Sequence, residues 1–119
     1  MRSDRDRLED ILEAIERIER HTFAGREVFD SDELVQTWVV HHLEIIGEAC
    51  SRVSAEFRER HPDVPWRGYT GMRNILAHQY FGIDLEPVWL AATEELDSLK
   101  SAIRAMRAGV DKDEPPLPS

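Results

Sequence analysis

The chain has 119 residues, 41% of them hydrophobic, and a formal net charge of −9, values that are typical of one globular domain with a single core. The lone Cys50 excludes an intramolecular disulfide, and no apolar run is long enough to cross a bilayer. The charged N-terminus lacks the apolar core of a signal peptide, so we expect a cytoplasmic protein without a membrane partner.

The first half of the chain contains two predicted helices. Ser3 and Asp6 form a plausible N-cap pair for the first helix, and the second is expected to begin at residues 30–33 and to run to about Phe57. Both show the apolar spacing of amphipathic helices. The apolar faces are Leu8, Ile11, Leu12, Ile15 and Ile18 in the first helix and Val35, Trp38, Val39, Ile45, Ile46, Ala49 and Val53 in the second.

A third helix is expected to begin at Pro65 and to end near Tyr80, where Gly82 offers a left-handed exit. It contains Gly68 and Gly71, and each glycine costs a helix interior about 1 kcal/mol relative to alanine. We expect a close approach by another helix of the chain or by a second subunit to compensate for this cost, and the sequence does not decide between them.

The fourth predicted helix is capped by Asp84 and ends at Gly109. Its apolar residues step by four and three alternately, which is typical of an antiparallel bundle. The sequence thus predicts an all-α bundle of four, or with a short extra helix five, helices over residues 3–108 and a disordered tail over residues 109–119. The seam consists of Leu85, Trp89, Ala92, Leu96, Leu99, Ile103 and Met106.

The negative net charge argues against nucleic-acid binding, because neutralised phosphates supply most of that affinity. The charge is unevenly distributed, however. Residues 1–50 contain 6 Lys or Arg against 13 Asp or Glu, and residues 81–119 contain 4 against 8. Residues 51–80 contain 5 arginines against 3 acidic residues, so the net-positive stretch leads into the third helix.

That helix carries the pattern R-x4-H-x-Y in Arg73, His78 and Tyr80. Arginine is a permanent, forked phosphate donor and histidine moves protons near neutral pH, so the pair supplies what metal-free RNA cleavage needs. On a straight helix, five positions correspond to about 500° of rotation, which directs Arg73 and His78 about 140° apart. Two copies of the helix around a two-fold axis would bring both residue types to one cleft.

The segment GMRNILAHQYFGID over residues 71–84, with Pro65-Trp66 before it and LEIIGEA over residues 43–49, resembles the HEPN-domain ribonuclease toxins of the HepT type. The resemblance covers about residues 5–107. It implies a helical-bundle homodimer whose catalytic motifs face each other across the interface. It also implies a metal-independent endoribonuclease without cofactors, acting in a type VII toxin–antitoxin system with transfer RNA as the suggested target.

The resemblance also assigns roles within the motif. It implies that Arg73 and His78 are catalytic, that Asn74 is a supporting polar group that contacts RNA or orients His78, and that Tyr80 is the modified residue. The expected partner is a nucleotidyltransferase antitoxin that adds AMP to this tyrosine. The chemistry fits these residue types, because RNA carries its own nucleophile in the 2′-hydroxyl and needs only proton transfer and charge stabilisation.

Each of these residues also has a structural explanation. His78 could complement a helix dipole, and Arg73 could pair with Glu44 or Glu48; Tyr80 could be a residue at the rim of the core. Glu44 and Glu48 are expected to be solvated or paired with arginine.

Two other histidines and the tryptophans are also expected to have structural roles. His41 and His42 are expected in packing or at a dimer surface. Trp38, Trp66 and Trp89 are expected in the core, although an exposed Trp66 would be able to stack on a base. No H-E-x-x-H or other metal-ligand pattern is present.

Two other functional classes stay open from the sequence. The first is a non-catalytic helical module that binds a nucleotide or a partner protein in the same groove. The second is a structural bundle in which Arg73 and His78 affect stability alone.

Overall fold

In a computed structural model of the chain, the described residues are 3–71 and 85–113, with side chains described as far as residue 110. Every regular element within these ranges is helical, which confirms the all-α prediction for this part of the chain. Residues 66–71 are also helical. The elements are α1 (Asp4–Thr22), α2 (Arg26–Ser31), α3 (Glu33–Arg52), α4 (Ala55–Arg60), α6 (Glu86–Leu90), the π-helical turn η1 (Ala91–Glu95) and α7 (Leu96–Asp113).

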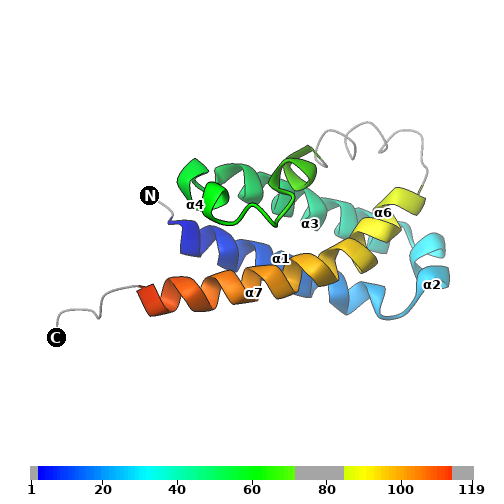
Figure 1. Ribbon diagram of the computed structural model, residues 1–119. Coiled ribbons are helices and arrows are strands. Elements are labelled where there is room, and N and C mark those ends of the chain that lie inside the picture. Colours follow the sequence, from blue (N-terminus) through cyan, green and yellow to red (C-terminus); the bar gives the residue numbers. More distant parts are fainter. Residues whose placement is uncertain (1–2, 72–84, 114–119) are drawn as a thin grey trace.

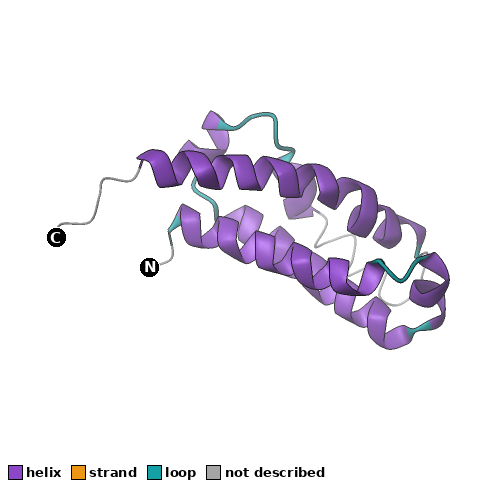
Figure 2. Ribbon diagram, turned by 90° about the horizontal axis from the view of Figure 1, so that it is seen from below, coloured by secondary structure: helices purple, strands orange, loops and turns teal. Residues whose placement is uncertain are grey.

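Three long helices form the body of the molecule. Helix α1 packs against both α3 and α7, and α6, η1 and α7 follow one another along the same side of the bundle (Figure 1). The N-terminus, α4 and the C-terminal turns of α7 lie at one end, and α2 lies at the other (Figures 1 and 2).

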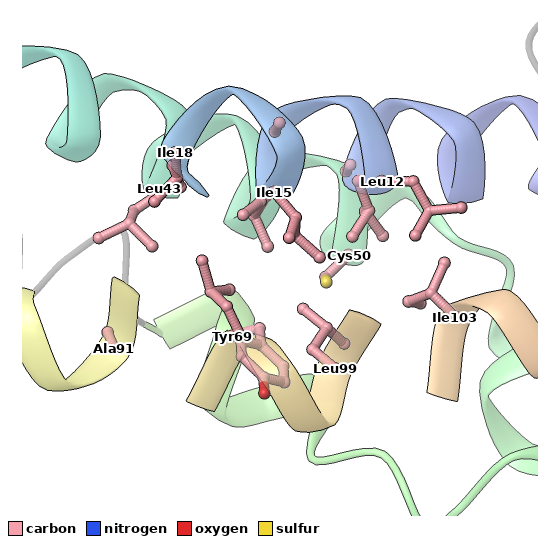
Figure 3. Packing of buried hydrophobic residues seen from close by; sticks show 14 of the residues in the cluster. Leu12, Ile15, Ile18, Leu43, Cys50, Tyr69, Ala91, Leu99 and Ile103 are labelled. Atoms are coloured by element: carbon pink, nitrogen blue, oxygen red, sulfur yellow. The ribbon is translucent and has the colours of Figure 1, made fainter. Parts of the chain in front are cut away.

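The core lies between these helices. All five apolar residues predicted for the first helix are buried, and Figure 3 shows side chains of α1 pointing toward Leu99 and Ile103 of α7, with Tyr69 beside Leu99. Burial raises the pKa of the Cys50 thiol to about 12, so this cysteine is an unreactive core residue. The predicted seam of the last helix is confirmed by the burial of Ala92, Leu96, Leu99, Ile103 and Met106.

The start of α1 agrees with the sequence prediction. The Ser3 hydroxyl accepts a hydrogen bond from the Asp6 backbone N–H, and the Asp6 carboxylate accepts one from the Ser3 N–H. This reciprocal arrangement is a capping box, which satisfies two backbone donors at the helix start.

The predicted extension of the second helix to Phe57 is wrong. Helix α3 ends at Arg52, and Val53 is extended with φ −63° and ψ 137°. Ser54 then caps α4, because its hydroxyl accepts from the Phe57 N–H, while its own N–H and hydroxyl donate to the Asp4 carboxylate at 2.8 and 2.7 Å. A contact with a residue 50 positions away thus interrupts a pattern that is helical in the sequence.

The short helix α2 was not predicted. It begins after Gly25, whose φ of 99° lies in the left-handed region, where glycine has no steric cost. Phe29 is fully buried and packs its ring 5.2 Å from that of Trp89. One buried aromatic residue therefore fixes this turn of helix to the bundle.

The predicted end of the last helix at Gly109 is also wrong, because α7 continues to Asp113. Val110 packs against the core, which gives the helix a reason to continue through the glycine. The predicted cap, Asp84, lies outside the described residues, as do residues 114–119 of the predicted tail.

Candidate functional site

The four residues assigned to the predicted site, Arg73, Asn74, His78 and Tyr80, lie outside the described residues. Gly82 and the expected end of the third helix also lie outside them. The structure does describe the two segments that hold this part of the chain, namely residues 64–71 before it and residues 85–95 after it.

The segment before the motif is anchored by two aromatic residues. Trp66 is 6% exposed, and its indole Nε1 donates to the His61 carbonyl at 3.0 Å. Tyr69, three residues later on the same helical face, is also 6% exposed and donates its hydroxyl to the Glu95 carbonyl at 3.2 Å. The burial of Trp66 confirms the core prediction, so the proposal that it stacks on a base from an exposed position is wrong.

The partner of Tyr69 belongs to an unusual turn. At the end of η1 the Leu96 N–H bonds to the Ala91 carbonyl, five residues back, and such π-helical turns frequently occur at functional sites. Burial, and then the nearby Glu95 carboxylate, raise the pKa of Tyr69 to about 12. The phenol is therefore a neutral hydrogen-bond donor that joins the helix leading into the motif to η1.

The segment after the motif is held at α6. Val88 is buried, and the Arg26 guanidinium bonds to Glu86 at 2.7 Å and to Asp30 at 2.8 Å. These contacts are exposed and contribute little stability, but they connect α2 with α6. Both ends of residues 72–84 are thus attached to the bundle by named contacts.

Gly68 and Gly71 do not accommodate a close neighbour in the described part of the chain. A Cβ atom on Gly68 would lie 3.8 Å from the Pro65 Cβ, which is ordinary contact, and one on Gly71 would have no described atom within 4 Å. The intrachain approach expected from the sequence is therefore not found among the described residues. The alternative, an approach by a second subunit, stays a prediction.

The side of α3 that faces α1 carries a shallow cavity of about 270 Å³. Arg7, His41, Glu44 and Glu48 are among its lining residues. The Glu48 carboxylate accepts from Arg52 at 2.6 Å, so the expected pairing with arginine is confirmed for this residue. The Arg7 Nε is buried without a hydrogen-bond partner in the described structure.

The histidines of α3 differ in environment. His42 is 2% exposed, and its Nδ1 lies 2.8 Å from the Trp38 carbonyl, so Nδ1 carries the proton that this oxygen accepts. Burial lowers the pKa of His42. The ring of His42 also lies 4.3 Å from that of Trp38 and 5.1 Å from that of His41, which confirms a packing role for His42; His41 is exposed.

Trp38 differs from the prediction. It is 37% exposed, so the expectation of a core position is wrong for this residue. Its indole Nε1 donates to the Arg17 carbonyl at 3.0 Å, which joins this residue of α3 to α1. Trp89, by contrast, is partly buried and packs against the core.

In residues 3–71 and 85–113, no group of three or more His, Cys, Asp or Glu side chains is arranged to hold a metal ion. None of the described helices is both long enough and apolar enough to cross a membrane.

A family model described as "Ribonuclease HepT-like" matches residues 11–106. This range includes residues 11–22 of α1, all of α3, most of α7 and the whole R-x4-H-x-Y motif. The chain belongs to the HepT-like ribonuclease family. This HepT-like family is the one that the R-x4-H-x-Y segment resembles.

Individual relatives agree with this assignment. A protein of Thermococcus cleftensis named "Probable ribonuclease HepT" is 43% identical over 110 residues, which is 89% of this chain and 97% of that protein. Candidate RNases of Caldanaerobacter subterraneus subsp. tengcongensis and Methanocaldococcus jannaschii are 38% and 36% identical, covering 87% and 90% of this chain and 94% and 90% of their own lengths. No solved structure matches the HepT-like chain.

Sequence reasoning about this HepT-like chain missed Tyr69 and its contact with Glu95. The signal was present, because Tyr69 follows Trp66 by three positions, and residues at this spacing share a helical face. The carbonyl partner had no sequence signal, since it belongs to a π-helical turn 26 residues away.

Proposed function

We propose that this chain is a metal-independent endoribonuclease that uses Arg73 and His78 as its catalytic residues. The family match carries the proposal, because it spans residues 11–106 and includes both side chains in the R-x4-H-x-Y motif. The names of the relatives support RNA as the class of substrate. Transfer RNA is the target that we expect.

The proposed reaction is transesterification within the RNA strand. The 2′-oxygen attacks the adjacent phosphorus while His78 accepts its proton, the bond from phosphorus to the 5′-oxygen breaks, and an imidazolium returns a proton to that oxygen. Arg73 holds the phosphate oxygens through charge-assisted hydrogen bonds as charge builds up on them. The products are a 2′,3′-cyclic phosphate and a 5′-hydroxyl, and Asn74 supports His78 from one turn earlier on the same face.

We also propose that the active form is a homodimer with its motifs at the interface. Two observations support this arrangement. Arg73 and His78 diverge by about 140° on one straight helix, so that a single helix directs only one of them at a given phosphate. In addition, no described atom lies within 4 Å of where a Cβ of Gly71 would stand, and a second subunit would be able to pack closely against the backbone there.

The proposed biological role is that of a toxin in a type VII toxin–antitoxin system in the cytoplasm. The partner would be a nucleotidyltransferase that transfers AMP from ATP to the Tyr80 oxygen and releases pyrophosphate. A bulky anionic group two residues beyond His78 would occupy the RNA site and repel phosphate from Arg73. The position of Tyr80 within the motif supports this proposal.

RNA cleavage by purified variants tests the catalytic proposal. We expect His78→Ala and Arg73→Ala each to reduce cleavage at least 100-fold with little change in melting temperature, whereas Arg104→Ala, which removes an exposed arginine of α7, retains wild-type cleavage. Wild-type cleavage should persist in excess EDTA, and DNA of the same sequence should survive because it lacks the 2′-hydroxyl. Full cleavage by a folded His78→Ala protein would contradict the proposal.

A further inference from the structure

A second cavity lies at the end of the bundle where α1 begins, α4 ends and the last turns of α7 pass (Figure 1). Its volume is about 490 Å³, which is within the range of roughly 300–1,000 Å³ of small-molecule sites. The lining divides into a cationic side and an apolar side. The lining includes Arg5, Phe57, Arg60, His61, Met106 and Gly109.

The cationic side is held in place by Phe57. This ring is 3% exposed, the Arg60 guanidinium carbon lies 5.6 Å from its centroid, and the His61 ring lies 4.6 Å from it. Within the described structure, the Arg60 guanidinium has no hydrogen bond or ion pair. Two planar cationic or protonatable groups therefore lie on one buried aromatic ring, with their polar atoms available to a ligand.

The charge of this cavity differs from that of the whole protein. Among its described lining residues are two guanidinium groups, those of Arg5 and Arg60, and one carboxylate, that of Asp4. Both oxygens of that carboxylate accept hydrogen bonds from Ser54. The excess of guanidinium groups in this lining favours an anionic ligand, in contrast to the net charge of −9 for the whole chain.

The apolar side comes from α7. Met106 is nearly buried, and Gly109 leaves open space, because a Cβ atom there would have no described atom within 4 Å. Glycine inside a helix is unfavourable compared with alanine, and here its missing side chain widens the cavity. A ligand with a flat or apolar body would occupy this space, while its charged group would reach Arg60.

We propose that this cavity binds a nucleoside monophosphate unit, with its phosphate on the Arg60 guanidinium and its base against His61 and the wall formed by Met106 and Gly109. Guanidinium groups bind phosphate oxygens in pairs, and planar cationic and aromatic groups stack on bases. The unit is either a free nucleotide or one nucleotide of an RNA strand; the second source rests on the proposed ribonuclease function.

Calorimetric titration of the full wild-type chain with AMP tests this site. We expect saturable binding of AMP. Adenosine alone and inorganic phosphate alone should each bind at least tenfold more weakly, because adenosine contacts only the apolar side of the cavity and phosphate only the cationic side. Arg60→Gln should weaken AMP binding at least tenfold. Gly109→Leu should abolish it by filling the cavity, and its melting temperature should not fall, since leucine is the better helix former. Arg104→Gln on the exposed side of α7 is the matched control and should bind as the wild type does.

A short 2′-O-methyl oligonucleotide distinguishes the two sources, because it cannot be cleaved through its 2′-oxygen. If the oligonucleotide binds more tightly than AMP and Arg60→Gln weakens this binding, the site belongs to the RNA strand. If the oligonucleotide binds no more tightly than AMP, the site belongs to a free nucleotide. Failure of the wild type to bind either probe, or binding unaffected by Arg60→Gln and Gly109→Leu, would overturn the proposal. A His78→Ala chain that loses cleavage but keeps AMP binding separates this result from the test of catalysis.

Discussion

At the scale of single residues, the chain has two tyrosines with different roles. Tyr69 is buried and donates to the Glu95 carbonyl, so it holds the helix before the motif against η1. Tyr80 is the proposed site of AMP addition. Because each loses only a hydroxyl when it is changed to phenylalanine, the two variants are matched controls for each other.

We expect Tyr69→Phe to lower the free energy of unfolding by about 1 kcal/mol, since a buried hydrogen bond is lost, and to remain a substrate for the nucleotidyltransferase. Tyr80→Phe should keep its stability and most of its ribonuclease activity but gain no AMP. Denaturant unfolding measures the stability of both variants. Intact-protein mass spectrometry after incubation with ATP, Mg²⁺ and the nucleotidyltransferase measures the AMP that each variant gains. Added mass on Tyr80→Phe would disprove the assignment of this tyrosine.

His42 gives the fold a dependence on pH. Burial lowers its pKa, so the unfolded chain binds a proton at a higher pH than the folded chain does. Its contribution to stability is therefore complete above the unfolded pKa of about 6.5 and is lost as the pH falls from there toward the folded pKa.

We expect the free energy of unfolding to fall as the pH drops below about 6.5, and His42→Gln to remove part of this fall while it lowers stability at pH 7. Urea titrations of the wild type and of His42→Gln at several pH values measure the effect. A slope that is unchanged in His42→Gln would show that other groups are responsible.

At the scale of elements, Ser54 divides what the apolar spacing presents as one helix. Its hydroxyl caps α4, and its N–H and hydroxyl also bond to Asp4 at the start of α1. An N-cap contributes about 0.5–2 kcal/mol, and the contact with Asp4 adds to that value. The break between α3 and α4 therefore depends on one serine and a distant carboxylate.

We expect Ser54→Ala to lower the free energy of unfolding by about 1–2 kcal/mol. Ser51→Ala is the matched control, because the Ser51 hydroxyl donates only to the Glu48 carbonyl within α3 and alanine favours the helix. Thermal unfolding monitored by circular dichroism compares the two. Equal losses in both variants would contradict the capping role of Ser54.

At the scale of the whole molecule, the proposed active site needs two chains. Each protomer would supply an arginine and a histidine to a cleft on the two-fold axis. If the two sites are composite, a heterodimer of Arg73→Ala and His78→Ala chains contains one site with both wild-type side chains.

Mixing the two inactive variants, with unfolding and refolding to exchange subunits, should restore up to about a quarter of wild-type cleavage, because half of the dimers are mixed and each mixed dimer has one intact site. Light scattering should give a dimer for every sample. The control is the double variant mixed with itself, which stays inactive. An active protein that is strictly monomeric would rule out the shared site.

The sequence by itself determined the helical class, the core faces of α1 and α7 and the capping box at Ser3, because these depend on contacts between residues a few positions apart. It also supplied the R-x4-H-x-Y motif that resembles the family, since a motif consists of residue identities and their spacing. The helical class and the core faces are local features, which the spacing of apolar residues along the chain indicates directly.

Only the tertiary structure decided where helices end and what their ends enclose. The Ser54–Asp4 contact, the continuation of α7 through Gly109 and the Tyr69–Glu95 bond all join segments distant in the sequence or depend on packing against them. The cavity around Arg60 has the same origin, because α1, α4 and α7 meet there. Such contacts outweigh local propensity, since burial and hydrogen bonding between elements contribute more free energy than the helix preference of one residue.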